Sequence, residues 1–285
     1  MLVHTQRELA SGAGAPQKPE DFERLLLAAP NSSLLWVQFL AYYVNAADIE
    51  AARLIAQRAL KTMHFREVQE KFNVYMAWLN LEYKYGNQQS LDNALQQGVS
   101  ENKGKQLVLA LAQVFEDNND VQKAITLINK YLKRPQFKKS KKVWMALQRL
   151  QLRAKDFKLA DETLTRSLQS LSKHKLIETI SKYALAHFDF GSHDKARSLF
   201  EDLIQHYPKR TDLWHLYVDR EVKLGHVQQA RQLYERMLAG KATARNMKTV
   251  FKKYLALEMR YGDEHTQEIV RQKAAEYISQ MTQEK

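Results

Sequence analysis

The residues best suited to chemistry in this chain are basic, and they are concentrated in one place. The run from Lys133 to Lys142 holds six Lys or Arg residues and no acidic residue. Residues 121–175 contain 15 basic and 3 acidic residues, so this segment accounts for the whole net charge of +12. Clustered cations bind polyanions because they neutralise phosphates and release counterions. We therefore expect a phosphate-contacting surface that comprises Lys133, Arg134, Lys138, Lys139, Lys141 and Lys142, assisted by Arg149 and Arg153.

Two other interpretations of this basic run stay open at the level of the sequence. The run also fits a solvated loop between two repeats, and it resembles a nuclear localisation signal. The flanking segments add basic residues that an import signal alone does not need, which favours phosphate contact. A second run without acidic residues provides a further candidate surface, with Lys241, Arg245, Lys248, Lys252 and Lys253.

Glutamates and histidines are the residues that would carry catalysis, and their placement argues against it. Glu82, Glu221 and Glu258 have the chemistry of a general acid or base, but each stands alone at a repeated position. A hydrogen bond or ion pair with a neighbouring helix is therefore the expected role. The nine histidines lack the spacing of metal ligands, and the chain has no cysteine. We expect no catalytic residue, no metal, no cofactor and no small-molecule substrate.

A repeated helical frame must position these residues. Trp214, Tyr217 and Glu221 lie at offsets 0, 3 and 7, which places them on one face of an α-helix. Gly225, at offset 11, is placed to end that helix in a left-handed conformation. A second amphipathic run begins after it and contains Ala230-Arg231. The unit is therefore a helical hairpin.

The same frame recurs along the chain. Copies start at residues 36, 75, 108, 144, 180, 214 and 251, which are 33 to 39 residues apart. Offset 16 is alanine in five copies, and a small residue there lets two helices approach closely. A period in the mid-thirties with two helices per repeat is typical of tetratricopeptide-like arrays. We expect the residues that pack the hairpins together to be Trp36, Tyr75, Trp78, Trp144, Tyr183, Trp214, Tyr217, Glu221, Phe251, Tyr254 and Glu258.

The recurring aromatic residues have a second interpretation, because aromatic side chains also stack on nucleobases. Their recurrence at the same offset favours packing between hairpins. Only 9 Gly and 5 Pro residues occur, which favours an almost entirely helical chain. We expect an all-α fold, an α-solenoid of about seven hairpins in a right-handed superhelix. The expected organisation is a flexible segment over residues 1–20, one elongated domain over residues 21–281 and a tail over residues 282–285. No signal peptide or membrane span is expected.

Several segments resemble a known family. The frame Trp-x-x-Tyr-x-x-x-Glu followed by Ala-Arg resembles half-a-tetratricopeptide (HAT) repeats, which occur mainly in RNA-processing assemblies. Longer matching segments are Asp21–Ser33, Arg58–Thr62, Phe65–Glu67, Asn80–Glu82, Tyr207–Trp214 and Phe251–Tyr254. Together they resemble the C-terminal region of the ribosomal RNA processing protein five family, over about residues 20–281.

This resemblance implies a function and a location. It implies a nuclear, nucleolar module of small-subunit processome assembly and rRNA processing, whose partners are pre-ribosomal RNA and ribosome assembly factor proteins. The basic residues would then contact RNA, and no membrane partner is implied. The alternative is a purely protein-binding scaffold of another RNA-processing complex, in splicing or mRNA 3′-end formation, whose basic surface meets acidic protein tails.

Overall fold

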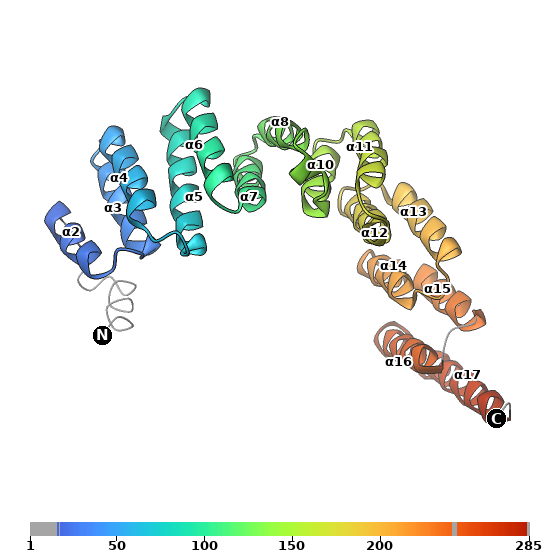
Figure 1. Cartoon of the computed structure of the whole chain (residues 1–285). Coiled ribbons are helices and arrows are strands. Elements are labelled where there is room, and N and C mark those ends of the chain that lie inside the picture. Colours follow the sequence, from blue (N-terminus) through green and yellow to red (C-terminus); the bar gives the residue numbers. More distant parts are fainter. Residues whose placement is uncertain (1–15, 17, 241–243, 284–285) are drawn as a thin grey trace. The chain divides into compact units, whose positions relative to one another are not determined.

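The computed structural model describes residues 16, 18–240 and 244–283, and every regular element in these ranges is an α-helix (Figure 1). The chain divides into two compact units, unit 1 over Met1–Lys138 and unit 2 over Lys139–Lys285. The helices of unit 1 are α2 (Pro19–Ala28), α3 (Ser33–Asn45), α4 (Ile49–Thr62), α5 (Val68–Tyr85), α6 (Gln88–Glu101), α7 (Gly104–Asp117), α8 (Val121–Leu132) and α9 (Pro135–Lys138). Those of unit 2 are α10 (Lys141–Arg153), α11 (Phe157–Ser170), α12 (Lys173–Asp189), α13 (His193–His206), α14 (Thr211–Lys223), α15 (Val227–Ala239), α16 (Ala244–Tyr261) and α17 (Glu264–Gln283).

Consecutive helices pack as hairpins, which are α3/α4, α5/α6 and α7/α8 in unit 1 and α10/α11, α12/α13, α14/α15 and α16/α17 in unit 2. The first helix of a hairpin also packs against the first helix of the next, as α3 does on α5 and α12 on α14. This pattern of nearest-neighbour contacts defines a repeat array. The expected all-α hairpin array is therefore confirmed, while the right-handed superhelix and the single elongated domain stay predictions.

The turn inside each hairpin has two forms. In five hairpins the residue at offset 11 has a positive φ, between 58° and 85°; these residues are Ala47, Asn119, Lys155, Gly191 and Gly225. Gly86 and Gly262 occupy the same offset, but neither is among the described residues that have a positive φ. The expected left-handed cap is therefore wrong at these two positions. A Cβ at Gly86 would lie 2.2 Å from the Glu82 carboxylate, and one at Gly262 would lie 2.3 Å from that of Glu258. Glycine stands there because the glutamate approaches the backbone closely.

Small residues let the helices of most hairpins approach closely. The alanines at offset 16 are completely buried, with 0% exposure, and they are Ala52, Ala124, Ala160, Ala196 and Ala230. Large side chains from neighbouring helices fill the space around them, and the largest cluster in unit 2 runs from α12 to α17. Within unit 2, the core therefore continues from hairpin to hairpin over α12 to α17, as in a repeat array.

Helix extends into the basic run and beyond both ends of the expected domain. A solvated loop, one of the interpretations left open for the run around Pro135, does not describe all of it, because Pro135–Lys138 forms α9 and α10 begins at Lys141. Buried Phe137 and Tyr131 pack their rings at 5.2 Å, which anchors that turn of helix. Helix α2 begins at Pro19, inside the segment expected to be flexible, and α17 continues to Gln283, inside the expected tail. Residues 1–15, 17, 241–243 and 284–285 lie outside the described ranges.

Candidate nucleic-acid interface

A basic stripe runs along the exposed face of α10 in unit 2. Lys142, Arg149 and Arg153 are spaced by seven and four residues, which places them on one side of the helix. All three are exposed, while Trp144 and Leu147 on the opposite side are buried. Because the buried side holds the helix against its neighbours, the stripe is presented outward.

The first turn of α10 is tied to α12. Lys141, which is only 23% exposed, forms an ion pair with Glu178, and its hydrogen bond lowers the pKa of that carboxyl group. The Lys175 ammonium group donates to the Lys139 carbonyl oxygen at 3.3 Å. Lys141 is therefore engaged within the protein, whereas the exposed side chains of Lys139 and Lys142 have no carboxylate partner among the described residues.

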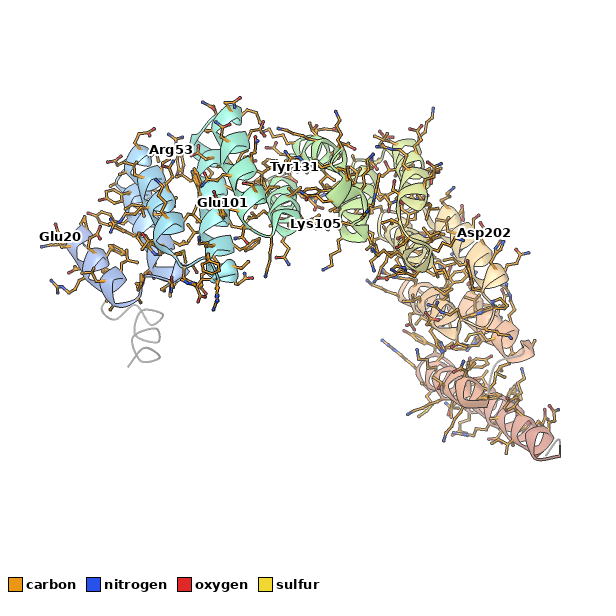
Figure 2. The ribbon with its side chains drawn as sticks, in the orientation of Figure 1. Glu20, Arg53, Glu101, Lys105, Tyr131 and Asp202 are labelled. Carbon is orange, nitrogen blue, oxygen red and sulfur yellow. The ribbon has the colours of Figure 1, made fainter. Side chains whose placement is uncertain are left out.

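The end of unit 1 carries the remaining members of the basic run. Lys133 caps α8, is exposed and has no ionic partner in the described part of the chain. The Arg134 guanidinium lies 4.8 Å from the centre of the ring of Tyr131 (labelled in Figure 2), a cation–π contact. Lys138 is the last residue of α9 and is also exposed.

Arg166 on α11 is a further exposed cation that was not selected from the sequence. Its guanidinium lies 5.7 Å from the Trp144 ring centre. Arg58 and Arg236 occupy the same offset, over Trp36 and Trp214, but each also pairs with a glutamate two helices earlier in the chain, on α2 and on α13. Arg166 has no such partner among the described residues. The sequence signal that would have identified Arg166 is the recurrence of an arginine at the same offset from the tryptophan in three repeats.

The second basic run lies on α16. Lys248 and Lys252 are exposed and stand one turn apart on the same side of the helix. Lys253 is exposed on another side. Burial lowers the pKa of the His215 imidazole on α14, and the charge of Lys253 lowers it further. Lys241 and the side chain of Arg245 lie outside the described residues.

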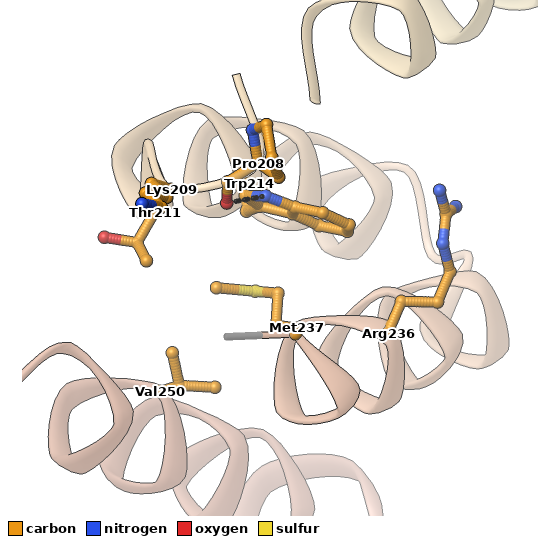
Figure 3. A pocket seen from close by; sticks show the side chains of 8 residues that line it. Pro208, Lys209, Thr211, Trp214, Arg236, Met237 and Val250 are labelled. Carbon is orange, nitrogen blue, oxygen red and sulfur yellow. Dashed lines mark hydrogen bonds between the residues drawn. The ribbon is translucent and has the colours of Figure 1, made fainter. Parts of the chain in front are cut away.

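The repeated aromatic residues lie in the core, which leaves them little surface for stacking on bases. Trp36, Tyr75, Trp78, Trp144, Tyr183, Trp214, Tyr217 and Tyr254 are all at most 8% exposed. Phe251 is partly buried and packs on Tyr277. The indole N–H group of Trp36 donates to the Pro30 carbonyl oxygen at 2.8 Å. That of Trp214 donates to the Pro208 carbonyl oxygen at 3.2 Å (Figure 3). A small cavity of about 120 Å³ beside Trp214 is bordered by Met237 and Val250.

Each of the three repeated glutamates is clamped by an arginine of the preceding hairpin. Arg53 on α4 (Figure 2) holds Glu82 on α5 with two hydrogen bonds of 2.8 and 3.0 Å. The Arg197–Glu221 and Arg231–Glu258 pairs repeat this geometry, with distances between 2.8 and 3.1 Å. These carboxylates are at most 3% exposed.

The clamps offset the effect of burial on the pKa of two of these glutamates. Burial alone would raise the pKa of Glu82 and Glu221, but the hydrogen bonds that each carboxylate accepts outweigh it, so both pKa values are lowered. A carboxylate that is held ionised by an arginine cannot serve as a general acid at neutral pH. Their role is to join neighbouring hairpins.

Within the described residues, no group of acidic residues and histidines is placed to hold a metal ion. No described helix has the length and apolarity that a bilayer crossing requires.

Comparison with known proteins identifies relatives along nearly the whole chain. The human Protein RRP5 homolog is 38% identical over 97% of this chain, and the Arabidopsis thaliana rRNA biogenesis protein RRP5 is 39% identical over 93%. The rrp5 protein of Schizosaccharomyces pombe is 37% identical over 93%. The chain spans only 14–16% of the length of these relatives.

Splicing factors are more distant relatives. The human pre-mRNA-splicing factor SYF1 is 24% identical over 80% of this chain and 25% of its own length. The Syf1/CRNKL1 C-terminal HAT repeat family matches residues 26–106, and the PRP39 N-terminal HAT repeat family matches residues 172–285. Among solved structures, a tetratricopeptide repeat protein from Parabacteroides merdae covers 86% of this chain and 92% of its own. Its 16% identity and TM-score of 0.37 are too low to support an argument.

Proposed function

We propose that this chain is a non-catalytic module of ribosome biogenesis, because it belongs to the RRP5 family and corresponds to its C-terminal HAT-repeat region. In this proposal it works in the nucleolus, contacts pre-ribosomal RNA through its basic residues and docks ribosome assembly factor proteins. The names of the relatives support the role in rRNA biogenesis. The assignment of RNA contact to particular residues is our own.

The concentration of positive charge in residues 121–175 is the observation that carries the RNA assignment. Outside residues 121–175 the chain holds as many acidic as basic residues, and many of these form ion pairs between helices. Inside that segment, the exposed side chains of Lys133, Lys139 and Lys142 lack carboxylate partners in the described part of the chain. Phosphates are the natural counterions of such cations. We expect weak sequence preference, because lysines of this kind bind phosphates rather than base edges.

Direct binding to RNA tests the proposal. Fluorescence anisotropy with a labelled single-stranded fragment of pre-ribosomal RNA measures the dissociation constant of the full chain. We expect saturable binding that weakens steeply between 50 and 200 mM salt, as phosphate contacts require. Saturable binding to an acidic peptide of equal charge, together with no binding to RNA at 50 mM salt, would contradict the proposal.

A splicing scaffold is the second candidate function, and the matches to SYF1 and to the HAT-repeat family of the pre-mRNA-splicing factor Syf1/CRNKL1 favour it. The lower identity to SYF1, 24% against 38% for the human RRP5 homolog, ranks it second. Localisation of the tagged chain separates the two candidates. Ribosome biogenesis predicts accumulation in the nucleolus, whereas a splicing scaffold predicts spread through the nucleoplasm.

A further inference from the structure

Unit 1 contains a groove that the RNA assignment does not use. The first helices of its three hairpins, α3, α5 and α7, line a cavity of about 440 Å³, which we call the unit 1 groove. Leu40 and Leu81, which are almost fully buried, supply an apolar floor, and half-buried Val44 and Val114 extend it. An apolar floor of this kind can accept small side chains from a partner.

Three side-chain amides stand along this groove. They belong to Asn45 on α3, Asn80 on α5 and Asn118, the residue that directly follows α7. The amides of Asn45 and Asn80 form no hydrogen bond with any described residue, and Asn118 uses only its N–H group, on the Val114 carbonyl at 2.7 Å. A primary amide offers two donors and an acceptor, which match the C=O and N–H groups of a peptide backbone.

The spacing of these amides suits an extended chain. Packed helices lie about 8–10 Å apart, and an extended peptide advances about 3.3 Å per residue. Amides on neighbouring helices would therefore meet backbone groups about three residues apart. A peptide that follows the groove can satisfy one amide per hairpin while it places small side chains on the apolar floor.

The charge of the groove argues against RNA as its occupant. Among its lining residues only Lys84 and Asp117 are charged, so the groove has no net charge. The Asp117 carboxylate already accepts a hydrogen bond from Gln113 at 2.8 Å. Tyr85, which is 54% exposed, adds an aromatic surface of the kind that is enriched in protein interfaces.

We propose that the unit 1 groove binds an extended, uncharged peptide segment of a partner protein, through Asn45, Asn80 and Asn118. The inference rests on the proposed function, since it identifies the chemistry by which an assembly factor would dock. It places protein binding on unit 1, whereas the strongest RNA candidates on α10 belong to unit 2.

A random peptide library provides the probe. The full chain is used to select from phage-displayed peptides of twelve residues, and the enriched peptides are synthesised and measured by fluorescence anisotropy. We expect enriched peptides with few charged residues, whose affinity for the Asn45→Leu/Asn80→Leu variant falls at least about tenfold, because two backbone hydrogen bonds are lost. Leucine keeps the side-chain volume and removes the amide, and circular dichroism verifies that the variant remains folded.

Asn129→Leu on α8 is the matched control, since Asn129 is half-buried like Asn80 but lies outside the groove. It should bind the selected peptides like the wild type. Equal affinity of wild type and double variant, or enrichment of acidic peptides alone, would overturn the inference. RNA affinity is measured on the same variants and should not change. If RNA binds and no groove-dependent peptide is found, this inference fails while the proposed function stands. If the asparagine variants lose RNA affinity, the groove is an RNA site and the inference also fails.

Discussion

Arg197 and Glu221 show at the level of single residues how neighbouring hairpins are joined. The glutamate is completely buried and depends on the guanidinium for its charge balance, with His226 as a second partner at 2.8 Å. Removal of one partner of a buried ion pair leaves an uncompensated charge. We expect Arg197→Ala to lower the free energy of unfolding by about 3–5 kcal/mol, measured by urea denaturation.

The control for this prediction is a pair of the same type on the surface. Arg271 and Glu268 are 52% and 53% exposed, so Arg271→Ala should cost at most about 0.5 kcal/mol. A similar cost for both variants would mean that the buried clamp does not join the hairpins as we describe.

Thr163 is a buried residue whose polar atom has no partner. Its hydroxyl group makes no hydrogen bond within the described residues, although the side chain is 0% exposed. We expect Thr163→Val to raise the free energy of unfolding by about 1 kcal/mol, because the substitution removes an unsatisfied group at nearly constant shape. Thr179 is equally buried but donates to the Lys175 carbonyl at 2.8 Å, so Thr179→Val should not stabilise the protein. Urea denaturation of both variants measures the difference.

We expect His187 to make the stability of unit 2 depend on pH. Burial, opposed by the charge of Asp161 and aided by that of Lys195, lowers the pKa of its imidazole. Both ring nitrogens lack a hydrogen-bond partner among the described residues. Below about pH 6.5 the unfolded state binds a proton that the folded state does not, so stability falls as the pH falls through this window.

The test of this pH dependence compares two proteins over one range. Thermal unfolding of the wild type between pH 7.5 and pH 5 should show a larger loss of stability than that of His187→Gln. The other titrating groups, including His215, are common to both proteins and cancel in the difference. Parallel curves would show that His187 is not the group responsible.

At the scale of secondary-structure elements, each helix depends mainly on its neighbours in the array. Trp214 on α14 is 8% exposed and contacts a core cluster that includes residues of α13, α15 and α16. We expect Trp214→Ala to cost about 3–5 kcal/mol, as for large core aromatics. Hydrogen exchange should show the loss of protection first in α12 to α17 and last in α3 and α4, because arrays transmit stability between neighbours. A uniform loss along the whole chain would contradict this picture.

The sequence predicted the elements far better than the contacts between them. Offsets of 3, 7 and 11 residues place Trp214, Tyr217, Glu221 and Gly225 because these distances are fixed by one helical period. The ion pair between Lys141 and Glu178 joins separate hairpins, and no local period encodes it. The left-handed cap expected at Gly86 was wrong for a similar reason. The close approach of the Glu82 carboxylate, and not a positive φ, requires glycine at this position. Burial of Phe137, which converts part of the basic run into α9, was also invisible to local patterns.

At the scale of the whole molecule, the end repeats differ from the middle repeats in how their charged residues are paired. Arginine–glutamate clamps join the hairpins near both ends, whereas Phe115, Gln151 and His187 occupy the glutamate offset in the middle repeats. The same middle repeats carry the excess of positive charge. We interpret the clamps as structural, and we propose that the middle repeats meet RNA.

The salt dependence of RNA binding tests this account most directly. Lys133→Gln/Lys139→Gln/Lys142→Gln removes three exposed cations that lack ionic partners in the described part of the chain. Lys61→Gln/Lys105→Gln/Lys223→Gln removes the same charge from exposed positions elsewhere. For single strands, each lost phosphate contact should make the slope of log affinity against log salt shallower by roughly 0.7. We predict that the first variant is shallower than the wild type by up to about 2 units, while the second keeps the wild-type slope. Equal slopes for the two variants would contradict the assignment of RNA contact to this segment.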